Sequence, residues 1–439
     1  MAETKAARAQ AAITLPILNY VGKLGSGREM TWSFSQHKYG PQTGWDLNHV
    51  DAGNGISTRN GNPYLTNNPN DASTPNSTTM QEGWIEHMVS KWGLSTSGGL
   101  KYYLMDNEPS IWFKTHRDVH PIGAKMEEIY EDYLNYASLI REHDASAWIL
   151  GPEEWGWEGY LYSGYDQQYA LSHGWHWLPD RLAHGNLDYV PWLLRQLYRY
   201  QQSTGKRLLN ALSLHFFPQQ GENSNDDSDT MQMIRNESTR ELWDPNYIDP
   251  ASGIQTQVQL VPRMKQWVSE YYPGTFTAVT AYNWGDDSNL NGATTEADIL
   301  GIFGREGLTL ANRSSAPPAG SPTYLAMKMF RNYDGNNSGF GTASCSCAVG
   351  DPDQVSAFAA SRADGAMTVV VINKVATSEP VSIQVSNFGL GSSAAVWQIN
   401  SPSQASIKHI SSVAVSGGTL STRVPPQSIS LFIIPPASG

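Results

Sequence analysis

The segment from residue 102 to residue 109 reads Tyr102-Tyr103-Leu104-Met105-Asp106-Asn107-Glu108-Pro109. Its apolar part predicts a buried strand, and the proline, which has no backbone N–H to donate, ends the pairing. Glu108 is therefore expected at the carboxyl end of a strand, the edge where catalytic side chains stand in a barrel of parallel strands. A carboxyl group beside an amide fits the general acid of glycoside hydrolysis, although a helix-capping or ion-paired glutamate fits an isolated Asn-Glu-Pro equally well.

Strand-like and helical runs alternate on both sides of this segment. The predicted strands cover 13–18, 101–106, 147–151, 208–217, 275–280 and 299–305. The predicted helices cover 80–92, 126–143, 188–202, 256–272 and 322–333. Apolar strands that alternate with amphipathic helices predict a parallel sheet covered on both faces, which is either a (β/α)8 barrel or a doubly wound sheet.

The predicted secondary structure changes near residue 340, from alternating strands and helices to strands alone. A linker rich in Gly, Ser and Asn covers 335–353, and short strands without helices follow at 355–361, 366–374, 381–385, 394–399 and 428–435. Turn residues recur at the spacing of all-β domains. We therefore expect a barrel domain over 1–340 and a β-sandwich domain over 341–439.

The charge balance narrows the choice of partners. The chain has 41 Asp and Glu against 29 Lys and Arg, a net charge of −12, which argues against nucleic acid or an anionic membrane as a partner. No apolar run approaches the roughly 20 residues needed to cross a bilayer. The two cysteines, Cys345 and Cys347, are too few for a disulfide framework and lack neighbours at zinc-site spacing.

Aromatic residues are frequent in polar stretches. The chain has 15 Trp and 21 Tyr, and the Trp residues in polar, Gly-rich surroundings are Trp45, Trp155, Trp157, Trp175, Trp177 and Trp284. Indole faces beside amides and carboxylates suit a sugar ring, although half-buried loop anchors are the alternative. The polar segment 32–77 is too long for a simple connection, so we expect it to be functional.

Taken together, these stretches resemble glycoside hydrolase family 44, the endoglucanases and xyloglucanases of the retaining (β/α)8 clan. The matching stretches are 13–20, 102–112, 151–156, 212–217, 280–285 and 301–306. The resemblance implies a (β/α)8 barrel with a C-terminal sandwich. It also implies hydrolysis of internal β-1,4 linkages in plant cell-wall β-glucans with retention of configuration, and it assigns the acid/base role to Glu108.

The resemblance places the nucleophile at position 281, directly before the stretch Tyr-Asn-Trp-Gly, where the family has a glutamate and this chain has Ala281. A methyl group cannot attack an anomeric carbon. The simplest hypothesis is an engineered replacement that leaves the protein able to bind substrate without hydrolysing it. The alternatives are a natural β-glucan-binding protein without catalysis, and an active hydrolase in which Glu154 or Glu306 replaces the nucleophile.

Residues at the predicted strand ends are further candidates for substrate binding. They are Asn107, Trp112, Glu153, Glu154, Trp155, His215, Tyr282 and Trp284. We expect one of the two adjacent glutamates to hold a sugar hydroxyl, and Trp112, Trp155, Trp157 and Trp284 to offer stacking surfaces. His215 is expected to hydrogen-bond the nucleophile or a sugar, with core packing as the alternative.

The remaining expectations concern the termini, cofactors and location. One convincing strand precedes the Glu108 strand where the clan has three, so we expect N-terminal barrel strands to be missing from this chain. No cofactor is expected to be required. The acidic segment 225–229 has oxygen ligands for a structural calcium, with a solvated loop as the alternative. The resemblance implies a secreted protein, here expected to be monomeric, that binds β-1,4-glucan or xyloglucan polysaccharides and oligosaccharides, although residues 1–12 do not read as a signal peptide.

Overall fold

The computed structural model describes residues 2–6, 9–59, 63–403 and 406–437. The chain forms two compact units, which are described separately. Unit 1 contains residues 1–215 and 266–278, and unit 2 contains residues 216–265 and 279–439. This division differs from the domain boundary that the sequence predicts near residue 340. That boundary stays a prediction.

The parallel sheet is an incomplete (β/α)8 barrel, as its six strands follow the order β1-β4-β5-β6-β7-β8. Their bounds are Ala12–Leu15 (β1), Tyr102–Met105 (β4), Trp148–Glu154 (β5), Ala211–Phe216 (β6), Phe276–Tyr282 (β7) and Leu310–Ala311 (β8). β1 pairs directly and in parallel with β4, β4 with β5, and β5 with β6. One strand of this sheet thus precedes the Glu108 strand in the described residues, as the sequence predicted.

The three long helices of unit 1 agree with the predicted ranges 80–92, 126–143 and 188–202 to within two residues at each end. The long ones are α3 (Thr78–Trp92), α5 (Met126–His143) and α9 (Tyr189–Thr204), and the short ones are α1 (Ala2–Ala6), α2 (Gln36–Tyr39), α4 (Trp112–Thr115), α6 (Trp157–Leu161), α7 (Gly164–His173) and α8 (Pro179–Ala183). Pro191 lies in the first turn of α9, and Gly205 ends that helix in the left-handed conformation at φ 74°. No helix in the described part of the chain is both long and apolar enough to cross a membrane.

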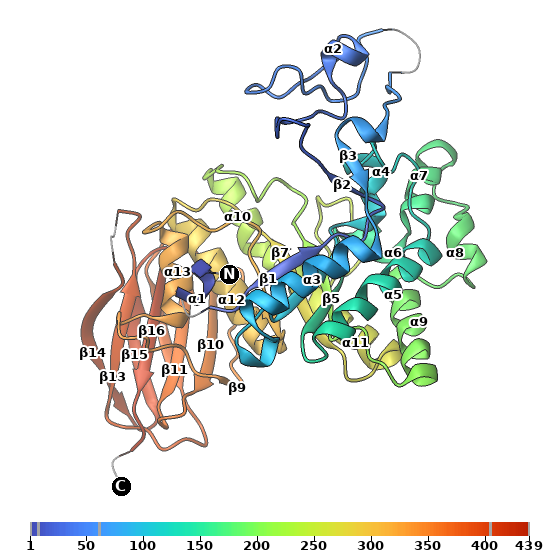
Figure 1. Ribbon diagram of the computed structural model, residues 1–439. Helices are drawn as coiled ribbons and strands as arrows, with labels where there is room; N and C mark the ends of the chain where they lie inside the picture. Colours follow the sequence, from blue (N-terminus) through green and yellow to red (C-terminus); the bar gives the residue numbers. More distant parts are fainter. Residues whose placement is uncertain (1, 7–8, 60–62, 404–405, 438–439) are drawn as a thin grey trace. The chain divides into compact units, whose positions relative to one another are not determined.

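Three long connections leave the carboxyl ends of neighbouring strands in unit 1. They run from β1 to α3, from β4 to α5 and from β5 to α9. The first contains the polar segment 32–77, the small antiparallel pair of β2 (Tyr20–Gly22) and β3 (Ser73–Pro75), and α2 (Figure 1). Because parallel strands share one carboxyl edge, these connections lie over the same edge of the sheet.

One predicted strand of unit 2 is a helix. The stretch 299–305 lies inside α12 (Leu290–Glu306), which ends at Gly307 in the left-handed conformation. An apolar run of strand length cannot be told from a buried helix segment by its pattern alone. The other helices that contribute to this unit are α10 (Asp229–Ser238), α11 (Leu260–Tyr271) and α13 (Pro322–Arg331). α11 begins just before Pro262, so this proline lies in the first turn and causes no kink.

The C-terminal strands form an antiparallel β-domain within unit 2 (Figure 1). They are β9 (Ala343–Cys345), β10 (Val355–Ser361), β11 (Met367–Asn373), β12 (Glu379–Gln384), β13 (Ser393–Ile399), β14 (Lys408–Ser416), β15 (Thr419–Val424) and β16 (Ser428–Ile434). β14 pairs with β13 through its first part and with β15 at its end, so it joins two layers. Val369 and Phe432 from one layer and Leu420 and Val424 from the other share one core.

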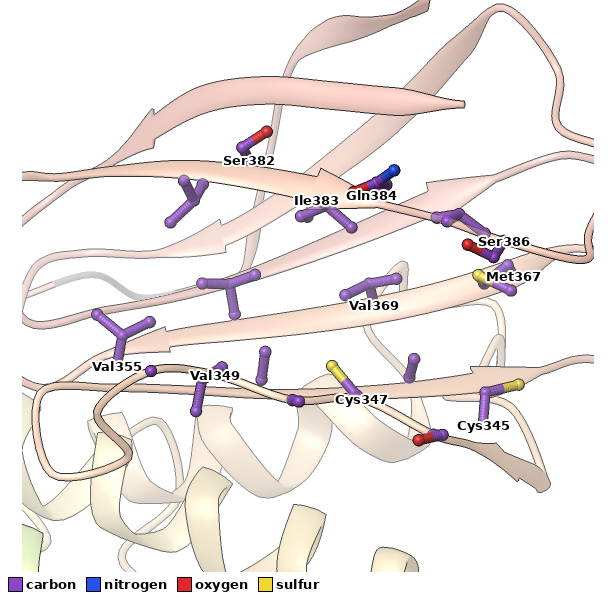
Figure 2. A pocket seen from close by; sticks show the side chains of 18 of the residues that line it. Cys345, Cys347, Val349, Val355, Met367, Val369, Ser382, Ile383, Gln384 and Ser386 are labelled. Atoms are coloured by element: carbon purple, nitrogen blue, oxygen red, sulfur yellow. The ribbon is translucent and has the colours of Figure 1, made fainter. Parts of the chain in front are cut away.

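The two layers also border an open pocket of about 820 Å³. Figure 2 shows Val369 of β11 and Ile383 of β12 on strands that line this pocket, with Cys345 and Cys347 on the segment that leads to β10. Both cysteines are free thiols. The apolar lining continues the core of the β-domain, and the cysteines pack against that core.

A buried ion pair fixes the β-domain to the helices of unit 2. Lys374 follows β11, and its Nζ lies 2.6 Å from Asp298 Oδ2 on α12, with both side chains no more than 3% exposed. The Thr239 hydroxyl donates to the same carboxylate at 2.7 Å. We predict that Lys374→Met lowers the free energy of unfolding in urea by roughly 3–5 kcal/mol, because it leaves a buried carboxylate without its cation.

The double variant Lys374→Met/Asp298→Asn should recover part of this loss, since it removes the orphaned charge. Lys408→Met, at an exposed lysine of β14, is the matched control and should change stability by no more than about 0.5 kcal/mol. Equal losses in Lys374→Met and Lys408→Met would contradict the role of the pair.

Candidate active site

Glu108 stands in a tight turn at the carboxyl end of β4. The backbone of Asp106 and that of Glu108 are left-handed, with φ of 63° and 52°, which costs energy for residues other than glycine. The Asp106 carboxylate holds the turn by accepting the amides of Ile17 and Leu18 at 2.6 and 2.8 Å. Asp106 is thus a buried hydrogen-bonding partner that positions the turn.

A chain of hydrogen bonds leads from Glu108 into the interior of unit 1. Glu108 Oε1 lies 2.9 Å from His215 Nδ1, and His215 Nε2 lies 3.3 Å from Glu153 Oε2. The Ser213 hydroxyl donates to the other oxygen of Glu153. Exposure of the side chains falls from 22% for Glu108 to 6% for His215 and 2% for Glu153, so only the first carboxyl group reaches solvent.

The two carboxylates keep His215 protonated. Burial alone lowers the pKa of His215, but its hydrogen bonds to Glu108 and Glu153 and their negative charges outweigh burial and raise this pKa to about 9. At neutral pH the ring is therefore an imidazolium, and both of its nitrogens donate. His215 fixes the Glu108 carboxyl group from one side, so its observed partner is the predicted acid/base residue, and a hydrogen bond to the nucleophile or to a sugar stays a prediction.

Glu154 points away from this chain. Its carboxyl group accepts the Ser110 hydroxyl at 2.6 Å and the Ser110 amide at 3.2 Å. The side chain is fully buried, and burial raises its pKa to about 8. A group that is neutral and enclosed at pH 7 is not placed to attack an anomeric carbon or to contact a sugar. The buried Glu153 likewise leaves no surface for the predicted sugar hydroxyl.

Glu306 is the last residue of α12 and pairs with Arg305 at 2.8 Å. α12 starts after the carboxyl end of β7, so a covering helix of this kind ends near the opposite edge of the sheet. This position does not fit the hypothesis that Glu306 replaces the nucleophile.

The aromatic candidates divide into buried and half-buried residues. Trp112 is 0% exposed, and its indole N–H donates to the Asn107 carbonyl at 3.1 Å. Trp284 is 2% exposed and donates to Ser238 at 2.9 Å. The predicted stacking role of these two residues is wrong for this structure, because no indole face is open to a sugar. Trp155 and Trp157 are half-buried and keep part of their surface.

The other predicted residues lie at strand ends in their own units. Asn107 is exposed beside Glu108, in unit 1. Ala281 is the penultimate residue of β7, in unit 2, and is half-buried. Tyr282 is buried, and its hydroxyl donates to Glu296 at 2.8 Å. Tyr282 therefore anchors the end of β7 to α12 and leaves little of itself for a ligand.

Two hydrogen-bonding residues of the site, Ser213 and Ser110, are not among the predicted residues. Ser213 lies two positions before His215 on β6, and the period of two in a strand places both on one face. That alternation could have identified it. Ser110, the partner of Glu154, has no comparable signal in the sequence, because its role depends on the turn after Glu108.

In the segment 225–229, which was predicted to bind calcium, Asp226 and Ser228 make hydrogen bonds at the start of α10. Asp226 accepts the amide of Ser228 at 2.9 Å, and Ser228 caps α10 by accepting the amide of Met231. In the described residues, the His and acidic groups close enough to share an ion lie elsewhere, around His143 and around His184. The calcium site stays a prediction.

The chain matches a protein-family model and is similar to solved structures. Residues 1–220 match the model of glycoside hydrolase family 44, which is half of the chain. The solved structure of CelM2, a bifunctional glucanase-xylanase from a metagenome library, is 54% identical with a TM-score of 0.96, covering 99% of this chain and 84% of that one. The family 44 xyloglucanase of Paenibacillus polymyxa is 25% identical with a TM-score of 0.78, covering 99% of this chain and 82% of that one.

Two curated proteins are also similar. Endoglucanase A of Paenibacillus lautus is 31% identical over 306 residues, which are 66% of this chain and 42% of that protein. Beta-mannanase/endoglucanase A of Caldicellulosiruptor saccharolyticus is 28% identical over 390 residues, which are 83% of this chain and 27% of that protein. The chain thus spans less than half the length of these two curated relatives.

The His215 ion chain makes stability depend on pH. The pKa of His215 in the fold, about 9, lies above its ordinary value of 6.5, so the stabilisation is complete below that ordinary value and is lost as the pH rises through 9. We expect the free energy of unfolding in urea to fall by roughly 2–3 kcal/mol between about pH 6 and about pH 10 from this group.

In His215→Asn most of this fall should disappear, whereas His176→Asn, at an exposed histidine, should keep it. A slope that is the same in both variants and in the parent chain would contradict the assignment to His215.

Proposed function

Because the chain belongs to glycoside hydrolase family 44, we propose that its fold is that of a retaining hydrolase of endoglucanase or xyloglucanase type, with internal β-1,4 linkages of plant cell-wall β-glucans as its target. The observation that carries this proposal is the chain Glu108–His215–Glu153 at the carboxyl edge of the parallel sheet. The 54% identity to a glucanase-xylanase supports the same substrate class.

In this mechanism Glu108 is the acid/base. It gives a proton to the glycosidic oxygen as the bond to the anomeric carbon breaks, and it later takes a proton from the attacking water. The carboxyl group must keep one position during both steps. His215 supplies that constraint, since its imidazolium holds Glu108 Oε1 at 2.9 Å and is itself held by Glu153.

We further propose that Ala281 occupies the nucleophile position and that the chain binds glucan with negligible turnover. A retaining mechanism needs a second carboxylate roughly 5–5.5 Å from the acid/base to form the glycosyl-enzyme. A methyl group has no electron pair for this attack. Neither of the two alternative glutamates, Glu154 and Glu306, has surroundings that suit a nucleophile.

A non-catalytic β-glucan-binding protein on the same fold is the second candidate, and Ala281 is the observation that favours it. Restoring the carboxylate separates the two. A site that lost only its nucleophile should regain activity, and a site that has diverged in other ways should not. In either case the protein would act outside the cell, because its polymeric substrate is found there, and would work as a monomer without a metal.

Chemical rescue by azide tests whether position 281 is the nucleophile position. With an activated aryl β-cellobioside, the chain should show no turnover alone and should release an α-glycosyl azide when sodium azide is added. Azide is small enough to enter the space left by the missing carboxylate and to attack the anomeric carbon directly. Turnover without azide would show that another carboxylate is the nucleophile. If no product forms with or without azide while glucan binding is intact, the non-catalytic binding protein is favoured.

Restoring the carboxylate at position 281 tests the acid/base role of Glu108. Ala281→Glu should raise hydrolysis of β-glucan by about three orders of magnitude or more. Adding Glu108→Gln to this variant should lower that rate about 10²–10⁴-fold, because the leaving sugar needs a proton. Formation of the glycosyl-enzyme from a dinitrophenyl cellobioside should slow far less, because dinitrophenolate leaves without a proton. A pre-steady-state burst of dinitrophenolate would report the rate of this step. A burst reduced as strongly as glucan hydrolysis would contradict the acid role.

A further inference from the structure

The turn that carries Glu108 is strained and must be held by its surroundings. Asp106 and Glu108 both have left-handed backbones, and such conformations persist only where the surrounding structure fixes them. The His215 imidazolium holds the Glu108 side chain at 2.9 Å. The backbone of the turn is held by other groups, which connect it to β1 and β5, the strands on either side of β4.

Buried carboxyl groups fix both ends of this turn. Asp106 ties its start to the segment that follows β1. Glu154 of β5 ties its end, because its carboxyl group accepts both the hydroxyl and the amide of Ser110. Between them, the Glu108 amide donates to the Glu153 carbonyl at 2.9 Å. Glu154 thus holds, at two atoms, the residue that lies two positions after the acid/base.

The pair of Glu154 and Ser110 is enclosed and closely packed. Glu154 is 0% exposed and Ser110 is 1% exposed. Gly159 of α6 covers the pair so closely that a methyl group there would lie 2.8 Å from Glu154 Oε2 and 2.9 Å from Ser110 Oγ. Burial raises the pKa of Glu154 to about 8, so its carboxyl group is neutral at pH 7. The link between β5 and the turn is therefore short, uncharged and protected from water.

We propose that Glu154 is a positioning residue for the acid/base Glu108. Its buried carboxyl group offers no surface to a sugar, and it acts through Ser110 on the backbone that carries Glu108. Proton transfer needs hydrogen-bond reach, and a displacement of about 1 Å can cost about 10²-fold in rate. This inference rests on the proposed function, since it concerns the acid/base step, but the hold of Glu154 on the turn can be measured without any turnover.

NMR titration of the histidine rings in the present chain tests this hold. Burial lowers the pKa of His215, and its hydrogen bond to Glu108 is the largest of the contributions that raise it to about 9. Glu154→Leu removes both bonds to Ser110 and should loosen the turn, so this pKa should fall by at least about 1. Glu154→Gln keeps an acceptor oxygen and the size of the side chain, and should change the pKa by less than about 0.3.

Kinetics in the Ala281→Glu chain test the consequence for catalysis. Adding Glu154→Leu should lower kcat on β-glucan about 10²-fold and change KM by no more than about twofold, because Glu154 does not contact the substrate. Formation of the glycosyl-enzyme from a dinitrophenyl cellobioside should slow far less, since dinitrophenolate leaves without a proton. Glu154→Gln should keep at least about a third of the parent rate on β-glucan, and Ser110→Ala, which removes only the hydroxyl, should lie between the two.

Asp144→Leu is the matched control. Asp144 is 2% exposed and accepts the amide and the hydroxyl of Ser95 at 2.6 and 2.9 Å, which is the same arrangement as that of Glu154 and Ser110. It precedes the start of β5, so it lies at the opposite edge of the sheet from Glu108. Asp144→Leu should lower the melting temperature much as Glu154→Leu does, and should leave the pKa of His215 and the ratio of the two rates unchanged.

An unchanged pKa of His215 in Glu154→Leu overturns the positioning role and leaves the proposed function standing. An equal loss on β-glucan and on the dinitrophenyl cellobioside also overturns it, because a smaller folded fraction lowers both rates alike. If Glu154→Leu does not fold, the same two outcomes in Ser110→Ala decide. An inactive Ala281→Glu chain overturns the proposed function and with it the acid/base step, whereas a lowered pKa of His215 would still support the hold of Glu154 on the turn.

Discussion

The imidazolium of His215 is the interaction on which the candidate site depends. Burying the Glu153 carboxylate without a cation would cost several kcal/mol, and this ring supplies the positive charge between Glu153 and the partly exposed Glu108. The three groups come from β6, β5 and the turn after β4, so the ion chain also ties three neighbouring strands together. The Glu108 carboxyl group is therefore held by a bond that stabilises the sheet as well.

Two adjacent glutamates of β5 take separate roles at an irregularity in the strand. The pairing of β5 with β6 shifts register between Pro152 and Glu154, and Glu153 has a left-handed backbone with φ of 59°. Glu153 meets His215, while Glu154 meets Ser110. Burial without a cation keeps Glu154 neutral, with its pKa raised to about 8. The same residue type thus takes part in an ion chain at one position and acts as an uncharged hydrogen-bonding group at the next.

The sequence predicted the alternating strands and helices and Glu108 at a strand end, because periodicity and proline act locally. It misassigned 299–305, where the helix is defined by its cap at Gly307 and by packing, and not by the apolar run itself. It also could not separate Trp112 from Trp155. Both follow the end of a predicted strand, and only the tertiary structure buries the first and leaves the second partly open.

Three residues of the site, Asp106, Glu108 and Glu153, have left-handed backbones that glycine would adopt without strain. Such conformations cost on the order of 1 kcal/mol each for other residues. Glycine at any of the three positions would relieve this strain and remove a carboxyl group from the site. The chain therefore carries its acidic residues here at a cost in folding free energy.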